Sequence, residues 1–276
     1  MIATGGSTMK RLAALLLMAV VVLASGCIGE NTGLTEKKVL NAIQNLETAR
    51  YSQNFSMSMH FLDPDTNNTV NLTMTGYVHG IFNKTSHLEI GNMSIKTHTM
   101  GMDMTMNWPY FINGSKVYFK VDGKWYYVPP QDNLYTQANG SLNINYIRNL
   151  LNEKNVTIKK LSDGYAFRVN VTFWEYVNAT NQSSYLAKMW GENSSDVMNI
   201  TTKSGWVEVH LRNDGTPTFI ETFMDIIITV KGYDGKSTNI YLTVHNRVAF
   251  SDINEHFTIK APNGIEKAGD FEDVLW

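Results

Sequence analysis

The chain has 276 residues, of which 43% are hydrophobic and 11% aromatic, and its formal net charge at pH 7 is −2. The apolar content excludes a disordered chain, and the near-neutral charge excludes a basic surface for nucleic acid or for an anionic membrane. The length suits one large domain or two small ones.

The first residues have the pattern of a secretory signal. Lys10 and Arg11 precede an apolar run, Leu12–Leu23, and small residues follow it. A basic start, a short apolar stretch and small residues before a cleavage site are typical of such signals. We therefore expect a signal peptide over residues 1–26, a short tether over 27–34 and a folded domain over 35–276.

Cys27 is the only cysteine of the chain. Residues 23–27, with the letters LASGC, resemble a lipobox. That resemblance implies that the Cys27 thiol is lipidated and that this residue becomes the first of the mature protein. The resemblance also implies that two acyl or alkyl chains hold the protein to the membrane. Because a single chain binds a membrane only marginally and two bind it stably, Cys27 is expected to be a stable anchor. The expected location is the outer face of the cell membrane.

Triplets of the form Asn-x-Ser/Thr are unusually frequent. Thirteen of the 28 Asn residues begin such a triplet, whereas about four are expected by chance for this composition. The excess predicts glycan acceptors on an exported surface, although an Asn- and Thr-rich strand face without glycans would give the same pattern. Together with a lipobox, this density resembles archaeal surface lipoproteins. The predicted acceptors are Asn54, Asn67, Asn71, Asn83, Asn92, Asn113, Asn139, Asn155, Asn170, Asn178, Asn181, Asn193 and Asn199.

The mature chain begins with a helical pattern and continues with strands. Thr35 can cap a helix whose apolar residues recur every three or four positions as far as Arg50. From there the apolar period changes to two, which predicts strands. Weaker helical patterns cover residues 141–151 and 183–191. The predicted strands include residues 55–61, 70–74, 100–106, 117–121, 125–127, 165–173, 207–211, 224–230 and 240–248.

Each predicted strand has one apolar and one polar face, which indicates an α+β fold that is mostly antiparallel β. Asn54, Asn71 and Asn170 fall on the polar faces of their strands. A glycan cannot be packed beneath another layer, so a glycosylated face must meet solvent. The apolar face must then be covered by a curled sheet, by helices or by a ligand.

The order of these elements is similar to that of the lipoprotein-carrier (LolA-like) superfamily. The best local matches are residues 110–119 (YFINGSKVYF) and 122–127 (DGKWYY), and residues 256–265 resemble the last strand of such proteins. The resemblance implies a curved, unclosed β-barrel (a half-barrel) with a few helices packed on its concave face. It also implies an apolar cavity that holds acyl chains.

We therefore expect a membrane-anchored extracytoplasmic lipoprotein that binds an apolar ligand, a lipid or acyl chain, in the half-barrel. No nucleic acid, cofactor or metal ion is expected. The residues expected to line the cavity are Phe55, Met57, Met59, Leu72, Met74, Met102, Met104, Phe119, Trp125, Phe167 and Val169.

Two alternatives stay open. The apolar face could be filled by the chain's own helices, which would make the protein a structural or interaction lipoprotein. Alternatively, the Met-x-Met spacing near His60 and His98 could bind Cu(I), which prefers soft sulfur ligands. Side chains two positions apart on a strand lie about 6.5–7 Å from each other, which favours a simple apolar face. Since no catalytic motif occurs, no enzymatic activity is expected.

Overall fold

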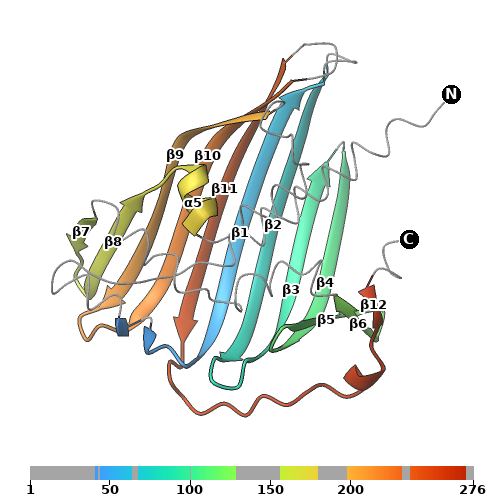
Figure 1. Cartoon of the computed structure of the whole chain (residues 1–276), viewed down its shortest axis with the longest axis vertical. Helices are drawn as coiled ribbons and strands as arrows, with labels where there is room; N and C mark the ends of the chain where they lie inside the picture. The colour runs from blue at the N-terminus through green and yellow to red at the C-terminus, as the bar shows by residue number, and fades with distance from the viewer. Residues whose placement is uncertain are drawn as a thin grey trace.

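The computed structural model describes residues 41–42, 44–63, 68–99, 101–128, 156–179, 198–231 and 237–271. These residues form one 12-stranded sheet with a short α-helix, α5 (Phe173–Ala179), and a 3-10 helix, η2 (Ile265–Lys267) (Figure 1). Residues 41, 42 and 44, ahead of the sheet, are also α-helical. The strands are β1 (Thr48–Leu62), β2 (Thr69–Asn83), β3 (Leu88–Thr99), β4 (Met102–Asn113), β5 (Lys116–Val121), β6 (Lys124–Val128), β7 (Thr157–Lys160), β8 (Gly164–Asn170), β9 (Met198–Arg212), β10 (Pro217–Lys231), β11 (Ser237–Ser251) and β12 (Gly269–Asp270).

The sheet consists of two antiparallel meanders that meet at β1. Its strand order is β12-β6-β5-β4-β3-β2-β1-β11-β10-β9-β8-β7. β1 pairs with β2 on one side and with β11, the last long strand, on the other. Neighbours are antiparallel except for the short parallel contact of β12 with β6. Because β12 and β7 end the order without pairing to each other, the sheet is unclosed, and the predicted curved half-barrel is confirmed.

The two faces of the sheet differ as the period-two pattern predicts. On β1, Phe55 and Met57 are buried, whereas their neighbours Asn54 and Ser56 are exposed. Residues paired across strands share a face, so the apolar positions of neighbouring strands lie side by side and form one core cluster. We call the side that carries this cluster the apolar face and the opposite side the polar face.

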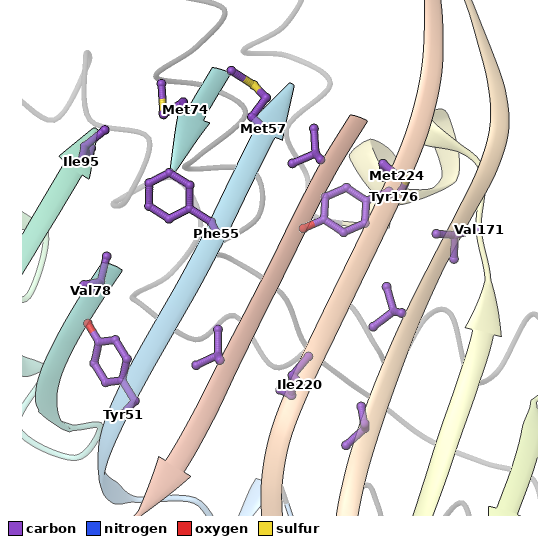
Figure 2. Packing of buried hydrophobic residues seen from close by; sticks show 14 of the residues in the cluster. Tyr51, Phe55, Met57, Met74, Val78, Ile95, Val171, Tyr176, Ile220 and Met224 are labelled. Carbon is purple, nitrogen blue, oxygen red and sulfur yellow. The ribbon is translucent and has the colours of Figure 1, made fainter. Parts of the chain in front are cut away.

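Helix α5 packs on the apolar face, where its residue Tyr176 is only 2% exposed and belongs to the core cluster (Figure 2). The helix starts with a capping box. The Glu175 carboxylate accepts a hydrogen bond from the Thr172 backbone N–H at 2.7 Å, and the Thr172 hydroxyl accepts one from the Glu175 N–H at 3.3 Å. These bonds satisfy donors that a helix start leaves without intrahelical partners.

Two predicted element boundaries are wrong. The predicted helix to Arg50 ends earlier, because Ala49 and Arg50 already belong to β1. Ala49 is fully buried in the strand. An apolar residue at this position agrees with both the helical period of three to four and the strand period of two. The strand predicted to reach Phe173 ends at Asn170, since the capping box turns residues 173–179 into α5.

The segment after β11 was expected to contain a last strand at residues 256–265, and this expectation is wrong. Residues 252–268 hold no strand and run along one end of the sheet from β11 to β12 (Figure 1). Asn254 fastens the segment to the start of β1 through its N–H to the Thr48 carbonyl at 2.7 Å. Arg50 adds an ion pair with Asp252 at 2.7 Å and lies over the Phe257 ring.

Candidate functional site

The apolar face carries most of the residues that were expected to line a cavity. Seven of these residues are 2–5% exposed and belong to the core cluster. Phe55, Met57 and Met74 are labelled in Figure 2. Such low exposure means that these side chains are closely packed and have little contact with solvent. The seven buried residues are Phe55, Met57, Met59, Leu72, Met74, Phe167 and Val169.

The other four expected lining residues lie elsewhere. Phe119 is half-buried on the apolar face beside Tyr110. Met102 and Met104 also lie on this face but are 57% and 54% exposed, because β5 pairs only with the far end of β4. Phe119 lies on the apolar face, and the next residue, Lys120, therefore faces the other side of the sheet. Trp125 pairs with Lys120 and so lies on the polar face.

Polar side chains interrupt the apolar face at two places. The Tyr51 and Tyr110 hydroxyls both donate to Oε1 of Glu89, which is only 2% exposed. Two positions after Tyr51 on β1, Gln53 Nε2 donates a hydrogen bond to Asn246 Oδ1 at 2.9 Å. Buried polar groups are generally hydrogen-bonded. The bonds to Glu89 link β1 and β4 to β3, and the Gln53–Asn246 bond links β1 to its neighbour β11. The polar groups lie among the apolar residues of this face, and the apolar residues around them still belong to one core cluster.

A groove of about 700 Å³ lies mainly on the polar face. It crosses the strands from β11 to β6, and Pro262 of the segment after β11 adds one wall. The residues that line it are Arg50, Tyr51, Ser52, Tyr77, His79, Gly80, Ile81, Ile90, Gly91, Asn92, Pro109, Tyr110, Lys120, Trp125, Ala249, Phe250, Ser251 and Pro262.

A second hollow of about 360 Å³ adjoins the groove over β2, β3 and β4. Tyr77, His79, Asn92 and Pro109 line both spaces, so the two form one continuous surface feature. Tyr77 is 43% exposed although it is a large aromatic residue. We call the combined feature the polar-face groove.

Trp125 contributes a distinctive group to the polar-face groove. Its side chain is 8% exposed, and its Nε1 atom is buried without a hydrogen-bond acceptor among the described residues. The ammonium of Lys120 lies 5.9 Å from the centre of the indole ring. A buried donor without an acceptor costs free energy, which makes this a place where a bound acceptor would be stabilising.

Charged and aromatic side chains form a ladder on the polar face of β8 to β11. Glu208 binds Arg168 at 2.7 Å and His210 at 2.6 Å. Burial acts to raise the pKa of Glu208, but the hydrogen bonds from His210 and Arg168 outweigh it and lower the pKa. Arg247 stacks on Phe219 at 3.8 Å. These groups satisfy one another, so we regard the ladder as a structural feature.

The predicted glycan acceptors can be placed for eight of the 13 positions. Asn83 is half-buried, and its side-chain oxygen accepts a hydrogen bond from the Ser86 N–H at 3.0 Å. The other seven are exposed: Asn54, Asn71, Asn92, Asn113, Asn170, Asn178 and Asn199. The remaining five (Asn67, Asn139, Asn155, Asn181 and Asn193), Cys27, the signal peptide and the tether lie outside the described residues.

The described part of the chain contains no group of three or more His, Cys, Asp or Glu side chains that could hold a metal ion. Among the same residues, no helix has the length and apolar character needed to cross a membrane.

The sequence interpretation missed the polar-face groove. The available signal was the presence of Tyr77 and His79 at polar positions on either side of the buried Val78. Such exposed aromatic residues are typical of binding surfaces. The groove itself could not be read from the sequence, because its walls come from seven strands and from Pro262.

Comparison with known proteins gives no family model and no curated protein that matches this chain. Among solved structures, LprF from Mycobacterium bovis is similar at 10% identity and a TM-score of 0.36, covering 85% of this chain and 99% of LprF. A structure of lipovitellin, titled for its lipid–protein interactions, gives 11% identity and a TM-score of 0.29, covering 79% of this chain but 26% of lipovitellin.

An outer membrane lipoprotein-sorting protein domain from Vibrio parahaemolyticus is similar at 9% identity and a TM-score of 0.17. The match covers 78% of this chain and 90% of that domain. Scores in this range do not establish a shared fold, so they assign no family to this chain.

Proposed function

We propose that this chain is an extracytoplasmic lipoprotein, anchored through Cys27, that binds an apolar ligand of the lipid or acyl-chain class on the apolar face of its half-barrel. One observation carries the proposal: a single cluster of apolar side chains runs along one face of a sheet that does not close on itself. Removing apolar surface from water is favourable, and an acyl chain is a chemically suitable contact for the part of this face that is exposed at Met102 and Met104.

The composition of the apolar face supports a flexible ligand. Met57 and Met74 are directly paired across β1 and β2, with Met59 and Leu72 in the next pair of the same face. The unbranched thioether side chain of Met adapts to ligands of different shape. An acyl chain, which has many conformations and no directional groups, suits such a wall.

Met102 and Met104 form the point of entry in this proposal. They lie on the apolar face of β4, at the end where β5 no longer pairs with that strand, and both are more than half exposed. A ligand that arrives there contacts apolar side chains before it reaches the covered centre of the face.

Fluorescent fatty-acid uptake and organic extraction of the purified full-length chain test this function. Saturable uptake and extractable lipid are expected. Replacement of both Met102 and Met104 by Glu should reduce uptake, because two carboxylates would then face the entering chain. The control is Thr105→Glu, which adds a charge to the other face of the same strand. Absence of both uptake and bound lipid would refute the proposal.

The burial of seven expected lining residues favours a second function, that of an interaction lipoprotein whose apolar face is filled by its own chain. This alternative predicts no uptake and no effect of the Met102 and Met104 substitutions on stability.

A third function, Cu(I) binding, predicts a Cu(I)-dependent rise in Tm that a Met102→Leu, Met104→Leu variant abolishes.

A further inference from the structure

We infer that the polar-face groove is a second binding site and that its ligand is a saccharide with an acidic group. The groove lies mainly on the side of the sheet opposite the apolar cluster, so this inference does not depend on lipid binding. It rests on the indole N–H of Trp125, on the charge of the lining residues and on the exposed aromatic surface.

The indole N–H of Trp125 calls for a hydrogen-bond acceptor. The side chain is more than nine-tenths buried, it lines the groove, and no described residue accepts its Nε1–H. Trp residues in folded proteins usually find a partner for this group when they are buried. A hydroxyl or carboxylate oxygen of a ligand would supply that acceptor, whereas the hydrocarbon of an acyl chain could not.

The charge of the groove favours an anion. Among the described residues that line it, none has a carboxylate, while Arg50 and Lys120 are both cationic. Arg50 is paired with Asp252, but Lys120 lies against the Trp125 ring and forms no ion pair recorded within the described residues. The ammonium of Lys120 is therefore available to an acidic group that binds beside the Trp125 ring.

The exposed surface of the groove suits sugar rings. A pyranose has an apolar C–H face and a rim of hydroxyls, and it is recognised by aromatic rings with polar groups beside them. Tyr77 and His79 supply adjacent rings whose centres are 5.4 Å apart, and the Asn92 amide lies 3.4 Å from His79 Nε2. A few polar groups set among apolar ones are what fixes the orientation of a ligand.

The length of the groove points to several linked rings. Its walls come from seven neighbouring strands, and strands lie about 4.8 Å apart, so the groove spans about 29 Å.

An acidic saccharide could reach the groove from two sources. One is a free or surface-bound oligosaccharide, and the other is a glycan on Asn92, which begins an Asn-Met-Ser triplet and lines both parts of the groove.

The test uses the full-length chain produced without N-glycosylation and follows Trp fluorescence during titration. The probes are tetragalacturonate and maltotetraose, which are matched α-1,4-linked tetramers with and without carboxylates. We expect saturable binding of tetragalacturonate that is at least tenfold tighter than that of maltotetraose. This preference should weaken between about 50 and 500 mM salt, because salt screens the charge of Lys120.

Three substitutions identify the site. Trp125→Phe keeps an aromatic ring but removes the N–H, and we expect it to weaken tetragalacturonate binding about fivefold. Lys120→Gln should abolish the preference over maltotetraose, and Tyr77→Ala should weaken both tetramers. Lys124→Gln, next to Trp125 but outside the groove, is the matched control and should change nothing. Circular dichroism and Tm verify that each variant is folded.

The glycosylated chain distinguishes the two sources. If its own glycan fills the groove, the glycosylated protein does not bind added tetragalacturonate and an Asn92→Gln variant regains binding. If the saccharide is external, both forms bind. Either result supports a saccharide site. Failure of the unglycosylated chain to bind tetragalacturonate, or binding that the three groove substitutions leave unchanged, overturns the inference, whatever the outcome of the fatty-acid assay.

Discussion

Phe55 of β1 lies directly opposite Gly76 of β2, and its ring occupies the space that a side chain at residue 76 would need. A Cβ atom placed on Gly76 would be 2.0 Å from Cζ of Phe55. The ring is 4% exposed and packed within the core cluster, so it cannot move aside freely. A large residue on one strand thus fits over a glycine on the next.

This pair gives the first prediction. Gly76→Ala should lower the free energy of unfolding by about 1–3 kcal/mol, because the added methyl group overpacks the core. Chemical denaturation measures the loss. In a Phe55→Leu background the same substitution should cost clearly less, since the ring is gone. An equal cost in both backgrounds would show that the contact with Phe55 is not the cause.

The buried hydrogen bond between Gln53 and Asn246 gives the second prediction. Both side chains are 2–3% exposed and the bond is 2.9 Å long. Gln53→Leu leaves the Asn246 oxygen without this donor and should cost about 1–3 kcal/mol of unfolding free energy. Replacing both residues by Leu should cost less than the sum of the single changes. Additive costs in this double-mutant cycle would argue against coupling.

The capping box of α5 gives the third prediction. Thr172→Ala removes the hydroxyl that accepts the Glu175 N–H and should destabilise the protein by about 1 kcal/mol. Glu175→Gln keeps a side-chain acceptor for the Thr172 N–H and should cost less. Thermal unfolding of the two variants compares these costs, and a larger loss for Glu175→Gln would contradict the prediction.

The pKa of Glu208 gives the fourth prediction. Although burial acts to raise it, the pKa is lowered by the hydrogen bonds from His210 and Arg168, so the folded state favours the charged carboxylate. The stability that this adds is fully present above the usual pKa of an unfolded Glu side chain and is lost as pH falls through the lower pKa of the folded state. Comparing wild type with Glu208→Gln by denaturation between about pH 2 and 6 should show a difference that shrinks on acidification.

The control for this prediction is Glu255→Gln, which changes an exposed carboxylate in the segment after β11. A Glu208→Gln difference that stays constant from neutral to acidic pH would mean that the hydrogen bonds do not favour the charged form.

The strands and their two faces were predictable from the sequence because they depend on local alternation. The buried Phe55, Met57 and Met59 alternate with exposed polar residues as expected. Hairpin turns were also predictable, since Asp122 and Gly123 both have positive φ, which this residue pair tolerates in a two-residue turn.

Features that depend on distant residues were not predictable in this way. The pairing of β1 with β11 joins residues such as Gln53 and Asn246, which are 193 positions apart. Helix α5 was missed because Val171 and Phe173 continue the alternation of β8 into the capping box. Trp125 was placed on the wrong side, since a short strand after a tight turn gives too few positions to fix its register.

The central place of the β1–β11 contact has a consequence for biogenesis. The first and the last long strand are mutual neighbours, so the middle of the sheet cannot form until almost the whole polypeptide has been synthesised. Contacts this remote along the chain also slow folding. Until β11 is available, the β1 edge of the Met-rich β1–β2 hairpin has no strand to pair with, and an unpaired strand edge of this kind is a site of aggregation.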